Sequence, residues 1–294
     1  MPDGLIWPHG PLIDGLLLLA SGLGAGLFGS LLGLGGGILI VPLLTLAFGL
    51  PLLTAVGVSL ICVIVTSGAA AGVYLERRVA NLRLGMTLEL FTASGAMVGG
   101  LIAFLLPERV VELIFTGLLV YVAVTMARRR DATPATAATP AQTTPTAPVA
   151  GTAPDARTRR AAFIDQMSGP GYRVRRLGFG MVGSVGAGVS SALLGIGGGL
   201  IKVPVMHVVM GVPLRVATAT SNLMIGITAS ASAIIYLLRG GIDPYVAAPT
   251  AVGVFIGASI GSRVASRVDL RILRGLFVAI LLYTAWQMLQ RAIA

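Results

Sequence analysis

The feature that most constrains this chain is a series of long apolar runs, each close to the roughly 20 residues that cross a hydrocarbon core of about 30 Å as a helix. Lipid gives the backbone no hydrogen-bond partners, so spanning segments must be helices or closed barrels. The ~10-residue alternation typical of barrel strands does not occur, and only 11% of the residues are charged. The sequence therefore predicts an all-α polytopic membrane protein embedded in a lipid bilayer. The runs are 12–32, 52–75, 84–105, 108–127, 177–194, 214–238, 246–262 and 272–290.

Charge and cysteine content argue against several function classes. The formal net charge is +10, but the arginines adjoin the apolar runs and no aromatic residues interleave with them, so we expect no nucleic-acid partner. The single cysteine, Cys62, lies in an apolar run and forms neither an internal disulfide nor a cysteine metal cluster. Residues 1–14 contain no Lys or Arg, so we expect no cleavable signal peptide. No catalytic triad or metal-ligand cluster emerges, and we expect neither an enzyme nor a cofactor.

The chain contains two copies of one unit. A shift of 162 residues aligns the region from about Gly24 to Arg129 with the second half of the chain without a gap. Chance similarity between apolar segments explains shared Leu and Val, but not shared Gly, Pro and Tyr at one constant spacing. The matched pairs include Gly35 with Gly197, Pro42 with Pro204, Ser59 with Ser221, Tyr74 with Tyr236 and Gly95 with Gly257.

A stretch rich in Ala, Thr and Pro separates the two copies and lacks the apolar periodicity that would drive folding. We therefore divide the chain into a first transmembrane repeat (1–130), a disordered linker (131–172) and a second transmembrane repeat (173–294). Nine arginines flank the linker, and the positive-inside rule places them, with the linker, in the cytoplasm.

The segment that opens each copy, 12–48 or 177–210, is too long for one crossing, because 37 helical residues extend about 55 Å. A glycine triplet lies inside each segment and favours a break there. We expect a full helix, a mid-membrane break and a re-entrant half-helix, which gives each copy an odd number of crossings and inverts one copy relative to the other. Inverted repeats place 17 basic residues inside and 3 outside, against 14 and 6 for parallel repeats. We prefer the inverted arrangement, and the parallel one stays open.

The two glycine triplets are the strongest candidates for a binding site. Unwound backbone there exposes N–H groups and the positive end of a half-helix, and both attract anions. The alternative is that the glycines only allow close helix packing. A nucleotide-binding loop is excluded, because no strand precedes the glycines and no Gly-Lys-Ser/Thr follows them. The candidates are Gly35, Gly36 and Gly37 in the first copy and Gly197, Gly198 and Gly199 in the second.

Polar residues near the triplets are further candidates. An ammonium group near the bilayer centre costs about 2.5–3.5 kcal/mol, so Lys202 either contacts the anion or extends to the cytoplasmic face. We expect Glu89 to form an interfacial ion pair with Arg83 rather than to couple protons. Hydroxyl and amide side chains can donate to a substrate, or can bond to helix carbonyls instead. These side chains are Ser59, Thr220, Ser221 and Asn222.

The duplicated Gly-x-Gly-Gly-Gly-x-x-x-Val-Pro motif at 33–42 and 195–204, with the segments 217–222, 241–244 and 257–261, resembles the signature of the TauE/SafE sulfite exporter family, also treated as the domain of unknown function 81 permeases. The resemblance covers the chain except for the linker. It implies transport of sulfite, sulfoacetate or related sulfur-containing anions across a bacterial inner membrane. The first copy departs from the pattern before Ser59, where a Val replaces the usual Thr.

These observations predict a multi-pass transporter of the bacterial inner (plasma) membrane. A small anion, sulfite or an organosulfonate by the resemblance, would bind at the half-helix ends while the two halves alternate access. Export of an anion from a cell that is negative inside is favoured by about 2.3 kcal/mol per charge per 100 mV, so a coupling ion is not required. An anion channel and a non-transporting membrane scaffold are the alternatives, and a homodimer stays open.

Overall fold

The computed structural model describes residues 11–32, 37–76, 80–128, 168, 172–264 and 270–293. All regular elements in these residues are helices. The expected linker lies outside the described residues except for Ser168 and Tyr172, and so do Gly35 and Gly36. The elements are α1 (Pro11–Leu32), α2 (Gly37–Ala47), α3 (Leu52–Glu76), α4 (Leu82–Ala103), α5 (Glu108–Arg128), α7 (Leu177–Leu194), α8 (Gly199–Pro204), η1 (Val205–Val209), α9 (Leu214–Leu238), α10 (Pro244–Val264) and α11 (Leu270–Ile293).

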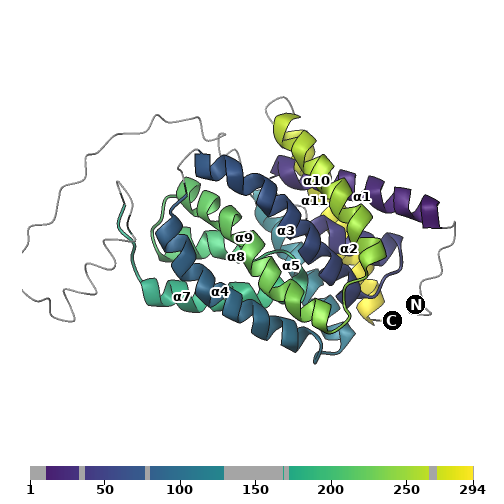
Figure 1. The fold of residues 1–294 in the computed structure, drawn as a ribbon, viewed down its shortest axis with the longest axis horizontal. Coiled ribbons are helices and arrows are strands. Elements are labelled where there is room, and N and C mark those ends of the chain that lie inside the picture. The colour runs from purple at the N-terminus through teal and green to yellow at the C-terminus, as the bar shows by residue number, and fades with distance from the viewer. Residues whose placement is uncertain are drawn as a thin grey trace, which may run out of the picture.

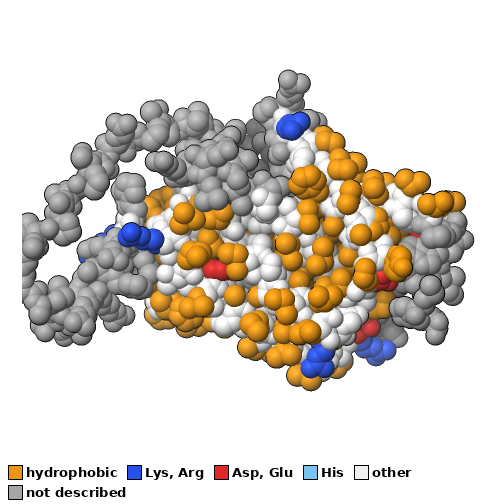
Figure 2. Space-filling view, in the orientation of Figure 1, with side chains coloured by type: hydrophobic (Ala, Val, Ile, Leu, Met, Phe, Trp, Pro, Cys, Tyr) orange, Lys and Arg blue, Asp and Glu red, His pale blue; other side chains and the backbone are white. Residues whose placement is uncertain are grey.

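Six of these helices are long and apolar enough to cross a membrane, namely α1, α4, α5, α7, α9 and α10. Many of their large hydrophobic side chains are exposed, among them Leu12, Leu90 and Phe179. Hydrophobic side chains cover much of the face in Figure 2, and Lys and Arg side chains lie only toward its edges. Such a surface suits contact with lipid chains, and the chain is a multi-pass membrane protein.

The long helices pack in pairs: α1 against α10, α4 against α7, α3 against α9 and α5 against α11. In Figure 1 the α1–α10 pair lies at the right and the α4–α7 pair at the lower left. Glycines allow this close packing. A Cβ atom on Gly26 would lie 2.3 Å from the carbonyl oxygen of Val254, and one on Gly188 would lie 2.0 Å from that of Thr92. No side chain fits at either glycine without separating the helices.

The chain changes direction between α7 and α8 through backbone that requires glycine. Gly195, Gly197 and Gly198 have φ values of 67°, 73° and 74°, in the left-handed region that glycine adopts without steric cost. α8 then continues directly into the π-helix η1, so that Gly199–Val209 forms one short apolar helical segment. The corresponding segment in the first half is α2, most of whose residues are buried.

Candidate functional site

The two glycine-rich segments meet at Ser59, a fully buried residue of α3. Its hydroxyl donates to the carbonyl oxygen of Gly195 at 2.7 Å and also lies 3.1 Å from that of Gly37. A Cβ atom on Gly37 would lie 2.9 Å from the Gly195 oxygen, so the two backbones are in direct contact. The structure thus brings together the start of α2 and the end of α7, with Ser59 between them.

Two buried hydroxyls lie beside the break that precedes α8. Ser191 on α7 and Ser221 on α9 are 0% and 1% exposed, and neither Oγ atom has a hydrogen-bond partner. A Cβ atom on Gly199 would lie 3.5 Å from Ser221 Oγ, and one on Gly198 would lie 3.4 Å from Ser191 Cβ. An unsatisfied buried hydroxyl costs about 1–3 kcal/mol, and such groups are rare in native proteins. This position can therefore supply two unused donors to a bound molecule.

The two breaks differ although their serines occupy equivalent positions in the duplicated sequence. Ser59 uses its hydroxyl to hold the glycine-rich segments together, whereas that of Ser221 has no partner. Ser191 has no polar counterpart, because Gly29 lies 162 residues before it. Free hydroxyl donors are therefore found beside the second break.

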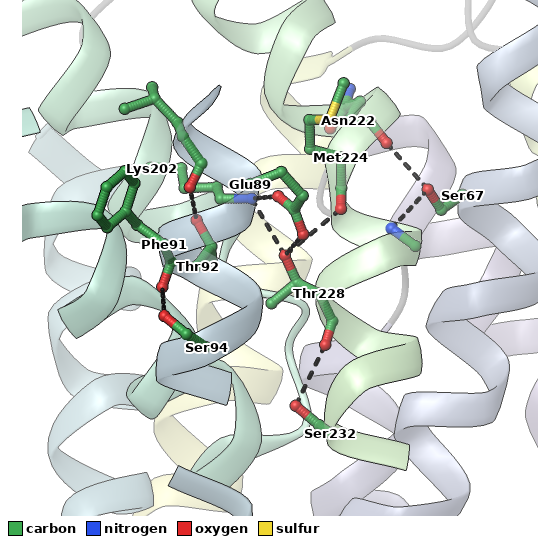
Figure 3. Close-up of polar contacts among 12 residues, drawn as sticks. Ser67, Glu89, Phe91, Thr92, Ser94, Lys202, Asn222, Met224, Thr228 and Ser232 are labelled. Carbon is green, nitrogen blue, oxygen red and sulfur yellow. Dashed lines mark hydrogen bonds and ion pairs between the residues drawn. The ribbon is translucent and has the colours of Figure 1, made fainter. Parts of the chain in front are cut away.

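A buried ion pair lies where α4, α8 and α9 meet (Figure 3). The Lys202 ammonium donates to Glu89 Oε2 and, at 3.1 Å, to Thr228 Oγ1; the Thr228 hydroxyl donates to Glu89 Oε1 at 2.5 Å. Lys202, Glu89 and Thr228 are 3%, 3% and 0% exposed. We call these three side chains the Glu89–Lys202–Thr228 cluster. They form a closed ring of hydrogen bonds between elements distant in sequence.

This cluster corrects two expectations. The predicted ion pair between Glu89 and Arg83 is wrong, because the Glu89 carboxylate is buried against Lys202 while Arg83 is exposed on the same helix. The alternative that Lys202 extends to the membrane surface is also wrong, since its side chain is 3% exposed. A buried carboxylate attracts the ammonium group more strongly than a distant interface does, because the charge interaction strengthens in a low dielectric.

The other two polar candidates take part in helix contacts. The Thr220 hydroxyl accepts from the backbone N–H of Asn81 at 2.9 Å, which joins α9 to the start of α4. The carbonyl oxygen of Asn222 accepts from the Ser67 hydroxyl at 2.9 Å, and Ser67 accepts in turn from the N–H of Gly226 at 2.9 Å. Thr220 and Asn222 therefore lie close to Ser221 along α9, and these bonds join α9 to α4 and to α3.

A contact outside the spans joins the start of the second half to α4. The Asn81 side-chain amide donates to the Tyr172 hydroxyl at 2.7 Å. Burial raises the pKa of Tyr172, and the hydrogen bond from Asn81 opposes part of that rise. Tyr172 is therefore neutral and can keep this contact at physiological pH.

Sequence reasoning missed Ser191 and the partner of Glu89. Ser191 is a polar residue in an apolar run whose duplicate carries Gly29 there. Glu89 and Lys202 likewise replace apolar residues of the duplicate, Ala251 and Ile40. Polar residues found in only one of two copies are the signal that would have identified all three.

Comparisons with known proteins agree on one family. The chain is 24% identical over 235 residues to the "Probable membrane transporter protein YunE" of Bacillus subtilis (strain 168), which covers 78% of this chain and 80% of that protein. It is 33% identical over 100 residues to the "Probable membrane transporter protein ORF9" of Sinorhizobium sp, covering 34% and 38% of the two chains. No solved structure shows a significant match. The family model described as sulfite exporter TauE/SafE matches residues 18–288, and the chain therefore belongs to the TauE/SafE family of membrane transporters.

Proposed function

We propose that this protein transports small anions, sulfite or organosulfonates, by alternating access, and that the anion binds beside the break between α7 and α8. The observation that carries the proposal is the pair of buried hydroxyls without partners, Ser191 and Ser221, on either side of this break. Both would donate to an oxyanion, which offers acceptors and no donor that competes with them. The site contacts are then Gly197, Gly198, Gly199, Ser191 and Ser221.

The backbone at the break supports the same assignment. The first N–H groups of the Gly199–Val209 segment have no carbonyl partner within their own helix. The positive end of the helix dipole adds a favourable interaction with a negative ligand. Such donors hold an anion without a fixed, unpaired charge, which would be costly inside the membrane.

The remaining candidates have supporting places in this proposal. Gly35, Gly36 and Gly37 belong to the first break, where Ser59 uses its hydroxyl to join the glycine-rich segments. Thr220 and Asn222 would hold α9 in place beside Ser221. Lys202 would supply a positive charge one helical turn beyond Gly198. All described contacts come from one chain, so the proposed site does not require a homodimer.

The architecture that we propose is a pair of inverted repeats, each with a re-entrant helix. Helix bounds support the duplication: α2 and α8, α3 and α9, α4 and α10, and α5 and α11 each begin 162 residues apart. The packing supports it too, because the same shift exchanges the α1–α10 pair with the α7–α4 pair. Inverted repeats with broken helices typically move against each other around a site near the bilayer midplane. The repeats would span 1–130 and 173–294 of a bacterial inner-membrane protein, with the 131–172 linker in the cytoplasm.

Uptake into proteoliposomes tests this function. We expect saturable uptake of labelled sulfite by the purified protein, with competition by sulfoacetate and weaker competition by chloride. Ser221→Ala removes one charge-assisted hydrogen bond and should raise the half-saturation concentration about tenfold or more.

The matched control is Ser232→Ala on the same helix. Ser232 is equally buried, but its hydroxyl bonds to the carbonyl of Thr228 in its own helix, so its uptake should match wild type. Uptake that rises linearly with sulfite would indicate a channel. No uptake by well-folded protein would favour a scaffold and would refute the proposed function.

A further inference from the structure

The Glu89–Lys202–Thr228 cluster is present in only one half of the duplicated chain. The residues 162 positions away from Glu89 and Lys202 are Ala251 and Ile40, both apolar. The equivalent of Thr228 is Thr66, whose hydroxyl bonds to the Cys62 carbonyl of its own helix at 3.0 Å. The other copy therefore builds the same helices without the ion pair, and the ion pair is not a requirement of the unit's folding.

Stability does not explain the pair either. Replacing a buried ion pair with well-packed apolar residues is often neutral or stabilising. Ionisable residues inside a membrane are rare, and by default they mark ion or proton pathways. A second, independent observation places this one beside the proposed anion site: the Lys202 N–H bonds to the Gly198 carbonyl at 3.1 Å. Ser221 and Thr228 lie two turns apart on one face of α9.

We propose that Glu89 is the proton-binding site of this transporter, and that one proton and one anion cross the membrane together. The inference rests on the proposed function and adds its coupling ion. A proton from the aqueous phase binds the Glu89 carboxylate oxygen that faces Lys202, while Thr228 can still donate to the other oxygen. Lys202 then loses its counter-ion, and the bound anion replaces it. On release, the proton returns to water and the ion pair reforms.

Charge balance makes the two binding events depend on each other. The empty site holds a carboxylate and an ammonium and is neutral; the site with both proton and monoanion is neutral as well. Either ligand alone leaves a net charge in a buried, low-dielectric position, which is strongly disfavoured. The two neutral states are therefore the ones that cross, which gives electroneutral symport with one proton per monoanion.

Few other titratable groups could take the place of Glu89. Helix α7, which packs on α4, carries none, and α4 itself adds Arg83, which is exposed. On α9, Arg215 lies in the first turn, and the Tyr236 hydroxyl donates to the Ala192 carbonyl at 2.9 Å. Among the described residues, Lys202 is the charged group recorded in contact with Glu89.

The test uses full-length protein in proteoliposomes whose membrane potential is held at zero with potassium and valinomycin. Exchange of labelled sulfite without a pH gradient measures transport; accumulation under an inward proton gradient measures coupling. With the outside one pH unit more acidic, wild type should accumulate bisulfite about tenfold, since one proton per monoanion converts a tenfold proton gradient into an equal anion gradient. Sulfite's own protonation is the same for every variant, so differences between variants belong to the protein.

In Glu89→Gln the accumulation ratio should fall to about one at any uptake rate. The matched control is Glu112→Gln, which removes another buried carboxylate, on α5 beside Arg291, and should keep the tenfold ratio. Glu89→Ala/Lys202→Ile introduces the residues of the other copy and should also give a ratio of about one, which covers the case in which Glu89→Gln does not fold.

The proposal is overturned if wild type exchanges sulfite but does not accumulate it under the gradient, or if either Glu89 variant keeps the tenfold ratio. Absence of exchange as well in wild type would instead refute the proposed function, and the coupling with it.

Discussion

Removal of one partner of the Glu89–Lys202 pair should destabilise the protein far more than removal of both. Lys202→Ile leaves the Glu89 carboxylate buried with Thr228 as its remaining recorded partner. Breaking a buried ion pair from one side costs about 3–5 kcal/mol, which corresponds to a fall of about 6–10 °C in the unfolding midpoint. Ile is chosen because Ile40 occupies the equivalent position in the other half.

The double variant Glu89→Ala/Lys202→Ile should recover most of this loss. Both positions then carry the residues of the other copy, Ala251 and Ile40, and no buried charge remains. Replacing a buried pair by apolar groups is often neutral or stabilising, so the double variant should unfold within about 2 °C of wild type.

The assay is thermal unfolding in detergent, monitored with a thiol-reactive dye. Cys62 is the single cysteine of the chain and is 0% exposed, so it reacts when the helices separate. Unfolding is irreversible in such scans, and the variants must therefore be compared at one heating rate. Equal midpoints for Lys202→Ile and wild type, or a double variant as unstable as the single one, would refute the view that these charges depend on each other.

Two further predictions concern packing and the centre of the fold. Gly188→Ala would place a Cβ atom 2.0 Å from the Thr92 carbonyl oxygen and should destabilise by about 1–3 kcal/mol, whereas Gly186→Ala, with no atom within 4 Å, should not lower the unfolding midpoint; equal effects would contradict the close packing of α4 and α7. Ser59→Ala removes the hydroxyl donated to the Gly195 carbonyl and should cost about 1–3 kcal/mol in the same dye assay, and an unchanged midpoint would show that this bond does not hold the two glycine-rich segments together.

Much of the fold could be predicted because length and hydrophobicity determine where a membrane helix begins and ends. The apolar run 214–238 coincides with α9, and 84–105 differs by two residues at each end from α4. The change of direction before α8 follows from Gly195, Gly197 and Gly198, which take backbone angles that other residues avoid. These are local properties, and one sequence is enough to recognise them.

The side-chain partners could not be predicted in the same way. The sequence indicated that Lys202 needed a partner, but the partner, Glu89, lies 113 residues away and is brought close by the packing of α4, α8 and α9. Similarly, the equivalence of Ser59 and Ser221 suggested equal roles, yet one hydroxyl is bonded and the other is not. Such differences depend on distances of a few tenths of an ångström between helices, which no residue pattern specifies.

The most direct test of the central claim is to locate the anion. Crystals grown with selenite, the heavier analogue of sulfite, would reveal the selenium atom by anomalous diffraction. The account predicts a peak within hydrogen-bond distance of Ser191 Oγ and Ser221 Oγ, beside Gly197–Gly199, that is lost in Ser191→Ala/Ser221→Ala. A peak at Ser59 or elsewhere, in protein that transports sulfite, would contradict it.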